Sequence, residues 1–184
     1  MRQPGSWGHF TEDFVDELVD WIGGRTVLEV FAGNGLLASK LERRGIDIVA
    51  TTLFRGHDSH DLGLHFPVKE MRASEAALEF NNREVLLMSW PTADEGALHA
   101  AIAWGEERPI AFIGEVTVLE RNLLGGCASD LFFELTEEMA TFQAYEPTNM
   151  LERAAIRELK EGAKLEFQRL VDEKMDAVAT KMGF

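Results

Sequence analysis

Hydrophobic positions along the chain follow two alternating spacings, a pattern typical of helices interleaved with strands. Apolar residues at three- and four-residue intervals over 10–22 predict a first helix, which Gly23 and Gly24 terminate. A short apolar, β-branched run over 26–31 predicts a buried strand directly after it. Further strands are predicted at 46–53, 85–90 and 109–115, with a short one at 68–71.

Helical spacing returns between these strands. It predicts a helix over 36–44 and another that ends at Trp104, for which Thr92 and Glu95 have the spacing of a capping box. A further helix is expected over 129–142. Strands separated by helices favour an α/β fold, with a Rossmann-like, mostly parallel sheet and helices on both faces.

The residues after Thr148 differ from the rest in charge and in pattern. Asn149 and Glu152 have the spacing of a second capping box, and the apolar positions that follow predict one long amphipathic helix over 149–184. This segment holds seven acidic and seven basic residues, whereas residues 1–148 hold 25 acidic and 11 basic ones. We therefore divide the chain into a main domain, 1–148, and a helical extension, 149–184.

Composition narrows the range of functions. With 184 residues, 46% of them hydrophobic, the chain can build one sizeable core and an appendage. A formal net charge of −14 opposes broad attraction to nucleic acid or to anionic lipid, so neither is an expected partner. The single cysteine excludes an intrachain disulfide. No signal-peptide pattern and no membrane-spanning run of apolar residues occurs, so a cytoplasmic protein is expected.

The most informative stretch is a glycine turn after the first predicted strand, Phe-Ala-Gly-Asn-Gly at 31–35. A strand that enters such a turn and then a helix presents backbone N–H groups at the carboxyl edge of a sheet, where open α/β folds bind ligands. Gly33, Gly35 and Ala38 also satisfy the dinucleotide pattern G-x-G-x-x-A. Two features argue against a dinucleotide: Glu29 would repel a pyrophosphate, and no acid stands about twenty residues further on.

An acid inside a strand followed by this turn resembles motif I of the class I S-adenosylmethionine-dependent methyltransferases, and the resemblance covers about residues 7–120. It implies S-adenosylmethionine as the cofactor. It also implies that Glu29 orients the ammonium group of the cofactor and that the turn passes beneath its methionyl and ribose parts. The turn residues expected at the cofactor are Phe31, Ala32, Gly33, Asn34 and Gly35.

Two further segments resemble cofactor-binding parts of this family. Its members usually carry an acid at the end of the second strand for the ribose hydroxyls, and Thr51 or Thr52 stands there instead. A hydroxyl is a weaker partner than a carboxylate, so ribose binding stays open. The segment 68–76 resembles the adenine-contacting segment, with Ser74 near a position where Asp is common. The residues expected near the base are Met71, Ala73 and Ser74.

By the same resemblance, the methyl acceptor is expected beyond the carboxyl end of the strand 85–90. The sequence Ser-Trp-Pro-Thr at 89–92 stands where amino-methylating nucleic-acid enzymes have D/N-P-P-Y/F, and it lacks the Asp or Asn. This absence and the acidic composition favour a small molecule or a protein partner as acceptor. Ser89 and Trp90 are expected at the cofactor, and Glu115 and Ser89 are the candidate catalytic residues.

Other residues have chemistry that this function does not require. Five that could bind zinc or iron are His57, Asp58, His60, Asp61 and His65, but a solvated loop explains them as well, and no metal is predicted. Cys127 is either a nucleophile at the pocket or, as we expect, a small buried thiol before a capped helix.

The resemblance weakens beyond Leu119. The sheet of the family usually finishes with a helix and an antiparallel hairpin, but only 141–146 suggests a strand here. The sheet is therefore either truncated or completed by the C-terminal helix, and a homodimer through that helix is a candidate because it would cover an exposed strand edge. The leading hypothesis is a methyltransferase. The alternative is a catalytically degenerate methyltransferase-like fold that serves as a binding or regulatory subunit, and an NAD-linked enzyme is third.

Overall fold

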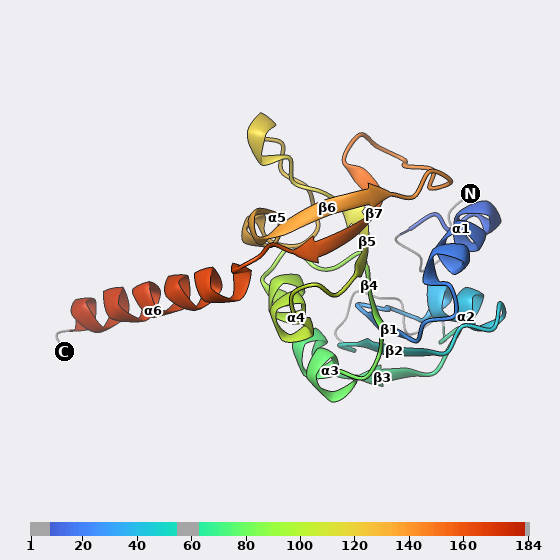
Figure 1. Cartoon of the computed structure of the whole chain (residues 1–184), viewed down its shortest axis with the longest axis horizontal. Coiled ribbons are helices and arrows are strands. Elements are labelled where there is room, and N and C mark those ends of the chain that lie inside the picture. Colours follow the sequence, from blue (N-terminus) through green and yellow to red (C-terminus); the bar gives the residue numbers. More distant parts are fainter. Residues whose placement is uncertain (1–7, 55–62, 183–184) are drawn as a thin grey trace.

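The computed structural model describes residues 8–54 and 63–182, which form a seven-stranded sheet with helices on both faces (Figure 1). The strands are β1 (Val27–Val30), β2 (Ile48–Thr52), β3 (Val68–Glu70), β4 (Val85–Ser89), β5 (Ile110–Glu115), β6 (Thr136–Thr141) and β7 (Glu152–Leu159). The helices are α1 (Glu12–Ile22), α2 (Leu36–Glu42), α3 (Ala73–Glu79), α4 (Gly96–Trp104), α5 (Asp130–Leu135) and α6 (Ala163–Met182), with a short 3-10 helix, η2 (Leu119–Arg121). The predicted α/β architecture is confirmed.

The strands lie in the order β3-β2-β1-β4-β5-β7-β6. The first five are parallel, and β7 runs antiparallel to both β5 and β6. Strand β1 lies between β2 and β4, so that Val27 faces Ile48 on one side and Val85 on the other. The chain changes direction across the sheet at this point, and open α/β sheets bind ligands beyond the carboxyl ends of the strands at such a switch point.

The pleat of β1 decides where its acid points. Leu28 and Val30 belong to the core beneath α3, α4 and α5, whereas Val27 belongs to the core beneath α1 and α2. Side chains alternate between the two faces of a strand, so Glu29 shares the face of Val27 and points toward α2. The exposed fraction of Glu29 is 1%.

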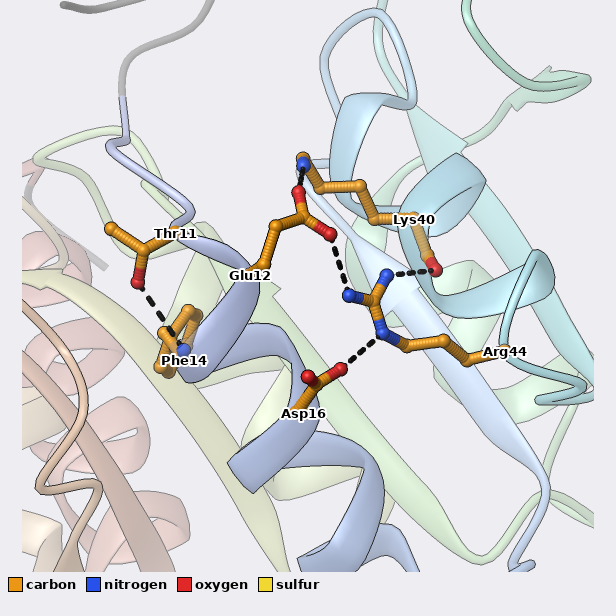
Figure 2. A network of polar contacts seen from close by, with 6 residues as sticks. All are labelled: Thr11, Glu12, Phe14, Asp16, Lys40 and Arg44. Carbon is orange, nitrogen blue, oxygen red and sulfur yellow. Dashed lines mark hydrogen bonds and ion pairs between the residues drawn. The ribbon is translucent and has the colours of Figure 1, made fainter.

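A polar network fastens α1 to α2 on the outside of this second core (Figure 2). Glu12 pairs with both Lys40 and Arg44, and Arg44 also reaches Asp16 at 2.5 Å. The side chain of Thr11 accepts a hydrogen bond from the backbone N–H of Phe14 and so caps α1. The network orients α1 against α2, whose first turn borders the carboxyl edge of the sheet.

The C-terminal part of the sequence folds differently from its prediction. The segment predicted as one helix over 149–184 contains β7, and α6 begins only at Ala163. The helix predicted over 129–142 ends at Leu135, and the chain continues directly as β6. The β6–β7 pair completes the sheet, so the expectation of a truncated sheet is wrong.

The sequence pattern did not predict β7 because charged residues occupy two of its buried positions. Arg157 is buried: its Nε donates to the Thr136 hydroxyl at 2.9 Å, and its guanidinium lies 5.3 Å from the ring of Phe133. Glu152 is also buried and accepts a hydrogen bond from the Thr148 hydroxyl at 2.8 Å. These charges broke the alternation of hydrophobic and polar residues on which strand prediction depends.

Helix α6 extends away from the body of the molecule toward the C-terminus (Figure 1). Near its start, Ala163 is buried and Phe167 packs against the core beneath α4. Further along, Val171, Met175 and Val178 are exposed. Within the described ranges, no helix combines the length and the hydropathy that crossing a membrane requires.

Candidate functional site

A cavity of about 650 Å³ opens at the carboxyl edge of the sheet, at the switch point between β2, β1 and β4. Cavities of this size are typical of cofactor and small-molecule sites. Its walls come from the N-terminal segment, the glycine turn, the ends of β2 and β4, and the starts of α2, α3 and α4. The lining residues are Gly8, Phe10, Glu29, Phe31, Ala32, Gly33, Asn34, Leu36, Leu37, Thr52, Leu53, Met71, Arg72, Ala73, Ser74, Ser89, Trp90, Thr92, Asp94, Glu95, Gly96 and His99.

The glycine turn forms the floor of the cavity, but its two glycines act differently. Gly33 lines the cavity at a positive φ of 55°. Gly35, with φ of 77°, does not line it: a Cβ there would lie 2.8 Å from the Cβ of Phe66 and 3.0 Å from a methyl carbon of Val68. Gly35 was expected at the cofactor; in the structure its missing side chain lets the turn fit closely against the segment before β3.

Glu29 is the most unusual group in the cavity. Among the described residues no group is in hydrogen-bond geometry with either of its carboxylate oxygens. Burial raises the pKa of Glu29 to about 8, and the backbone N–H of Ala38 in the first turn of α2 offsets only part of that effect. A buried carboxylate that no cation neutralises costs free energy, and a cation bound in the cavity would reduce that cost.

Two aromatic residues adopt the left-handed backbone region at the edge of the cavity. Phe31 follows β1 with φ of 59°, and Trp90 follows β4 with φ of 53°. The backbone N–H of Trp90 donates to the carbonyl oxygen of Ile113 at 2.7 Å, which holds the chain in place as it leaves the sheet. Strained backbone of this kind is concentrated at functional sites. Both aromatic side chains were expected at the cofactor, and both line the cavity.

The two threonines that end β2 point to opposite faces of the sheet, and only one of them lines the cavity. Thr51 is fully buried, and its hydroxyl donates to the backbone carbonyl oxygen of Glu29 at 3.3 Å. Thr52, which points to the opposite face, lines the cavity. Of the two threonines predicted at the ribose, Thr52 is therefore the one that can reach a ligand.

The segment expected near the base does reach the cavity. Met71, Ala73 and Ser74 all line it, where β3 ends and α3 begins. The backbone N–H of Met71 donates to the carbonyl oxygen of Thr52 at 3.0 Å, which joins this wall to the end of β2. The contact of these residues with adenine stays a prediction.

The two candidate catalytic residues separate in the structure. Ser89 lies at the end of β4 and lines the cavity. Glu115 does not line it, because its carboxylate accepts hydrogen bonds from the backbone N–H of Gly126 and from the side-chain amide of Asn149, both at 2.9 Å. Glu115 thus connects the loop after β5 to the loop before β7, an arrangement that favours a structural role.

No local pattern predicted that the start of α4 would form a wall of the cavity. The wall consists of Thr92, Asp94, Glu95, Gly96 and His99. Their spacing predicted a capping box at the helix start, but the N-cap residue is Glu95 and no side chain caps it. Oδ1 of Asp94 instead accepts the backbone N–H of Gly96 at 2.8 Å in the turn before α4. α3 and α4 pack against each other, and residues from the start of each line the cavity.

The remaining candidates lie apart from the cavity or outside the described residues. His57, Asp58, His60 and Asp61 fall outside the described ranges, and within those ranges no cluster of residues could hold a metal ion. The backbone N–H of His65 donates to the carbonyl oxygen of Asn34 at 2.8 Å. Cys127 is buried, and burial raises the pKa of its thiol to about 11, as expected for a packing residue.

Comparison with known proteins shows a similarity in fold to several solved structures. No protein-family model matches the sequence, and no curated protein does. Among solved structures, a mutant of MtNAS in complex with S-adenosylmethionine is similar over 80% of this chain and 62% of its own, with a TM-score of 0.54 and 11% identity. The mitomycin 7-O-methyltransferase MmcR (13% identity) and human N-acetylserotonin methyltransferase in complex with the same ligand (11% identity) have TM-scores of 0.49.

These similarities concern the fold. The present chain spans 53% of MmcR, 62% of MtNAS and 52% of the human enzyme. A mostly parallel sheet that finishes in an antiparallel β6–β7 pair, with a cavity at the switch point, defines a class I methyltransferase-like fold of the Rossmann type.

Proposed function

We propose that this chain is an S-adenosylmethionine-dependent methyltransferase that acts on a small molecule or a protein partner. The observation that supports it most strongly is the carboxyl group of Glu29, which is buried in the wall of a cavity of about 650 Å³ with no charged partner and with only the backbone N–H of Ala38 near it. The cofactor carries an ammonium group, which is the partner that this carboxylate lacks. Gly33 and Asn34 would pass beneath the methionyl and ribose parts of the cofactor. Met71, Ala73 and Ser74 would lie near its adenine base.

The chemistry requires little beyond positioning by the protein. The cofactor supplies a methyl group on a positively charged sulfur, from which transfer to a nucleophile is an in-line displacement. Much of the acceleration comes from holding the reactants in line, so an acid–base pair is not required. Ser89 and Trp90, which line the cavity at the end of β4, would orient the acceptor.

Calorimetric titration with S-adenosylmethionine, S-adenosylhomocysteine and NAD tests the proposal. We expect both sulfur ligands to bind and NAD not to bind. Glu29→Gln should weaken S-adenosylmethionine at least about tenfold, the usual effect of losing a hydrogen bond to a charged group. Glu79→Gln, on the exposed end of α3, is the matched control and should leave affinity unchanged. Tight binding of NAD, or of neither sulfur ligand, would contradict the proposal.

The second candidate is a degenerate methyltransferase-like fold that binds a partner without transfer. Glu115, one of the two candidate catalytic residues, accepts hydrogen bonds from Gly126 and Asn149 and does not line the cavity, and this observation supports the alternative. Mass spectrometry separates the two: native lysate incubated with the protein and deuteriomethyl-labelled S-adenosylmethionine should yield a product one labelled methyl group heavier. Cofactor binding without any such product would favour the degenerate fold.

We also propose that α6 mediates homodimerisation. Val171, Met175 and Val178 are exposed along it, and the acidic and basic residues after Thr148 are equal in number. Two copies that meet through a neutral helix avoid the repulsion of the acidic main domains. Light scattering should give a dimer mass for the full chain and a monomer mass for Met175→Glu. Leu78→Glu, at an exposed leucine of α3, should leave the dimer intact.

A further inference from the structure

Near its start, helix α6 contacts a residue that lines the cavity. The ring of Phe167 packs edge-on against the ring of His99, with 5.7 Å between their centroids. His99 lies in the first turn of α4 and belongs to the cavity wall. Two further contacts fix this end of α6, because Ala163 is buried and the backbone N–H of Lys164 donates to Oε1 of Glu106 at 3.2 Å. The start of α6 therefore contacts both the loop after α4 and the cavity wall.

After Phe167, α6 leaves the body of the molecule. Every residue from Val171 to Ala179 is exposed, and the helix extends away from the sheet (Figure 1). Arg169 forms exposed ion pairs with Glu166 and Glu173, and such pairs stabilise a helix only weakly. Helices of about 12–15 residues without tertiary packing are marginal in water. In a single copy of the chain the exposed part of α6 should therefore fray, and the fraying should reach Phe167.

The exposed apolar residues of α6 lie on the same face of the helix as Phe167. Val171, Met175 and Val178 follow Phe167 at intervals of four, four and three residues. Residues at these intervals are neighbours on one helix face. A second copy that covers this face, as proposed above, would hold the helix in place up to Phe167. The dimer contact and the cavity wall then share one ordered helix.

Resting on the proposed function and the proposed dimer, we infer that dimerisation through α6 and ligand binding in the cavity strengthen each other. In the monomer, ligand binding must also order the α4 wall and the start of α6, which costs conformational entropy. In the dimer the helix is already ordered, so the cavity binds its ligand more tightly. Such coupling is reciprocal, so each bound ligand tightens the dimer by the same factor. The contact between Phe167 and His99 carries the coupling.

Dilution of the full chain, followed by analytical ultracentrifugation, measures the dissociation constant of the dimer with and without saturating S-adenosylhomocysteine. The ligand should lower this constant at least about fivefold, the lower end of common coupling between sites. Met175→Glu, the monomeric variant, should bind S-adenosylhomocysteine about fivefold more weakly than the wild-type dimer does. The backbone amides of 163–170 should also exchange hydrogen faster in this variant than in the dimer.

Two substitutions at Phe167 test the route of the coupling. Phe167→Ala should reduce the effect of the ligand on the dimer constant to less than about twofold. Phe167→Leu keeps an apolar side chain but removes the ring, and it should reduce the effect in the same direction without the risk of an empty space in the core. Leu165→Ala, at an exposed residue on the opposite face of α6, is the matched control and should keep the wild-type effect.

The outcomes separate the inference from the proposals on which it rests. A ligand that binds without changing the dimer constant would overturn the inference while the cofactor proposal stands. An effect that survives in both Phe167 variants would assign the coupling to another contact and also overturn it. A chain that is monomeric at every concentration would refute the dimer and the inference together, and the calorimetric titration would still decide cofactor binding. If S-adenosylhomocysteine does not bind, the proposed function fails and the inference fails with it.

Discussion

The hydroxyl of Thr51 donates a hydrogen bond to the backbone carbonyl oxygen of Glu29, 3.3 Å away in the neighbouring strand. The bond adds a side-chain link to the parallel pairing of β1 and β2, in which Ala50 lies opposite Glu29. It fixes the backbone of the acid while leaving the carboxylate without a partner among the described residues. The site therefore combines a rigid strand with a buried carboxyl group that can pair with a cation once it loses its proton.

Glu29 should make stability fall as the pH rises. Burial raises the pKa of this carboxyl from 4.5 to about 8, so between these values the folded state binds the proton more tightly than the unfolded chain does. Its contribution is complete below pH 4.5 and is lost by pH 8. Glu29→Gln, which has no proton to lose, should gain stability over the wild type by about 1.4 kcal/mol per pH unit in this window. Urea unfolding of both proteins at pH 5, 6.5 and 8 measures the difference between their free energies of unfolding. A difference that does not change with pH would contradict this prediction.

Binding of a cationic ligand should release a proton from Glu29. At pH 7 the carboxyl, whose pKa is about 8, is mostly protonated, and pairing with an ammonium group requires the charged form. Titration with S-adenosylmethionine in buffers of different ionisation enthalpy should show release of close to one proton at pH 7 and almost none above pH 9. Glu29→Gln should show no release at either pH, and equal release by this variant would assign the proton to another group.

Gly35 should tolerate alanine less well than Gly45 does. Both have positive φ, 77° and 85°, so alanine costs about 1–2 kcal/mol of backbone strain at each. At Gly35 the added Cβ also meets Phe66 at 2.8 Å, whereas no atom lies within 4 Å of one at Gly45. We expect Gly35→Ala to lose about 1–3 kcal/mol more in chemical denaturation. Equal losses would mean that the segment before β3 moves aside without cost.

The network between α1 and α2 should be weakly stabilising and sensitive to salt. Lys40 and Arg44 lower the pKa of Glu12 to about 2, so its contribution is present above pH 4.5 and is lost as the pH falls toward 2. Because the pairs are exposed, Glu12→Gln should cost less than about 1 kcal/mol at neutral pH. This cost should shrink in 1 M salt. Glu42→Gln, at an exposed position of α2, is the control and should change little in thermal unfolding.

Two truncations should show which part of the C-terminal segment the folded sheet requires. Removal of residues 171–184 deletes the exposed part of α6 but keeps Phe167, so the cooperative thermal transition should remain. Removal of residues 149–184 also deletes β7, which lies between β5 and β6, and should abolish that transition. A folded chain that ends at Thr148 would show that the first five strands suffice.

Much of the site was readable from local pattern. The run Val-Leu-Glu-Val before a glycine turn predicted a buried strand, an acid within it and a ligand-binding edge, because each of these depends on residues close in sequence. Glu115 and Gly35, two of the expected site residues, do not line the cavity, for the opposite reason. The partners of Glu115 are Gly126 and Asn149, and Gly35 packs on Phe66, contacts that no local pattern encodes.

By itself the sequence determined the alternation of strands and helices, the turn at Gly33 and the acid at Glu29, because hydrophobic periodicity and backbone freedom act over a few residues. Only the tertiary structure decided that β7 is a strand, because buried Arg157 depends on Thr136 and Phe133 for its partners. It also decided that Glu95 lines the cavity. Such contacts join residues far apart in the chain, and their free energy exists only once the sheet has formed.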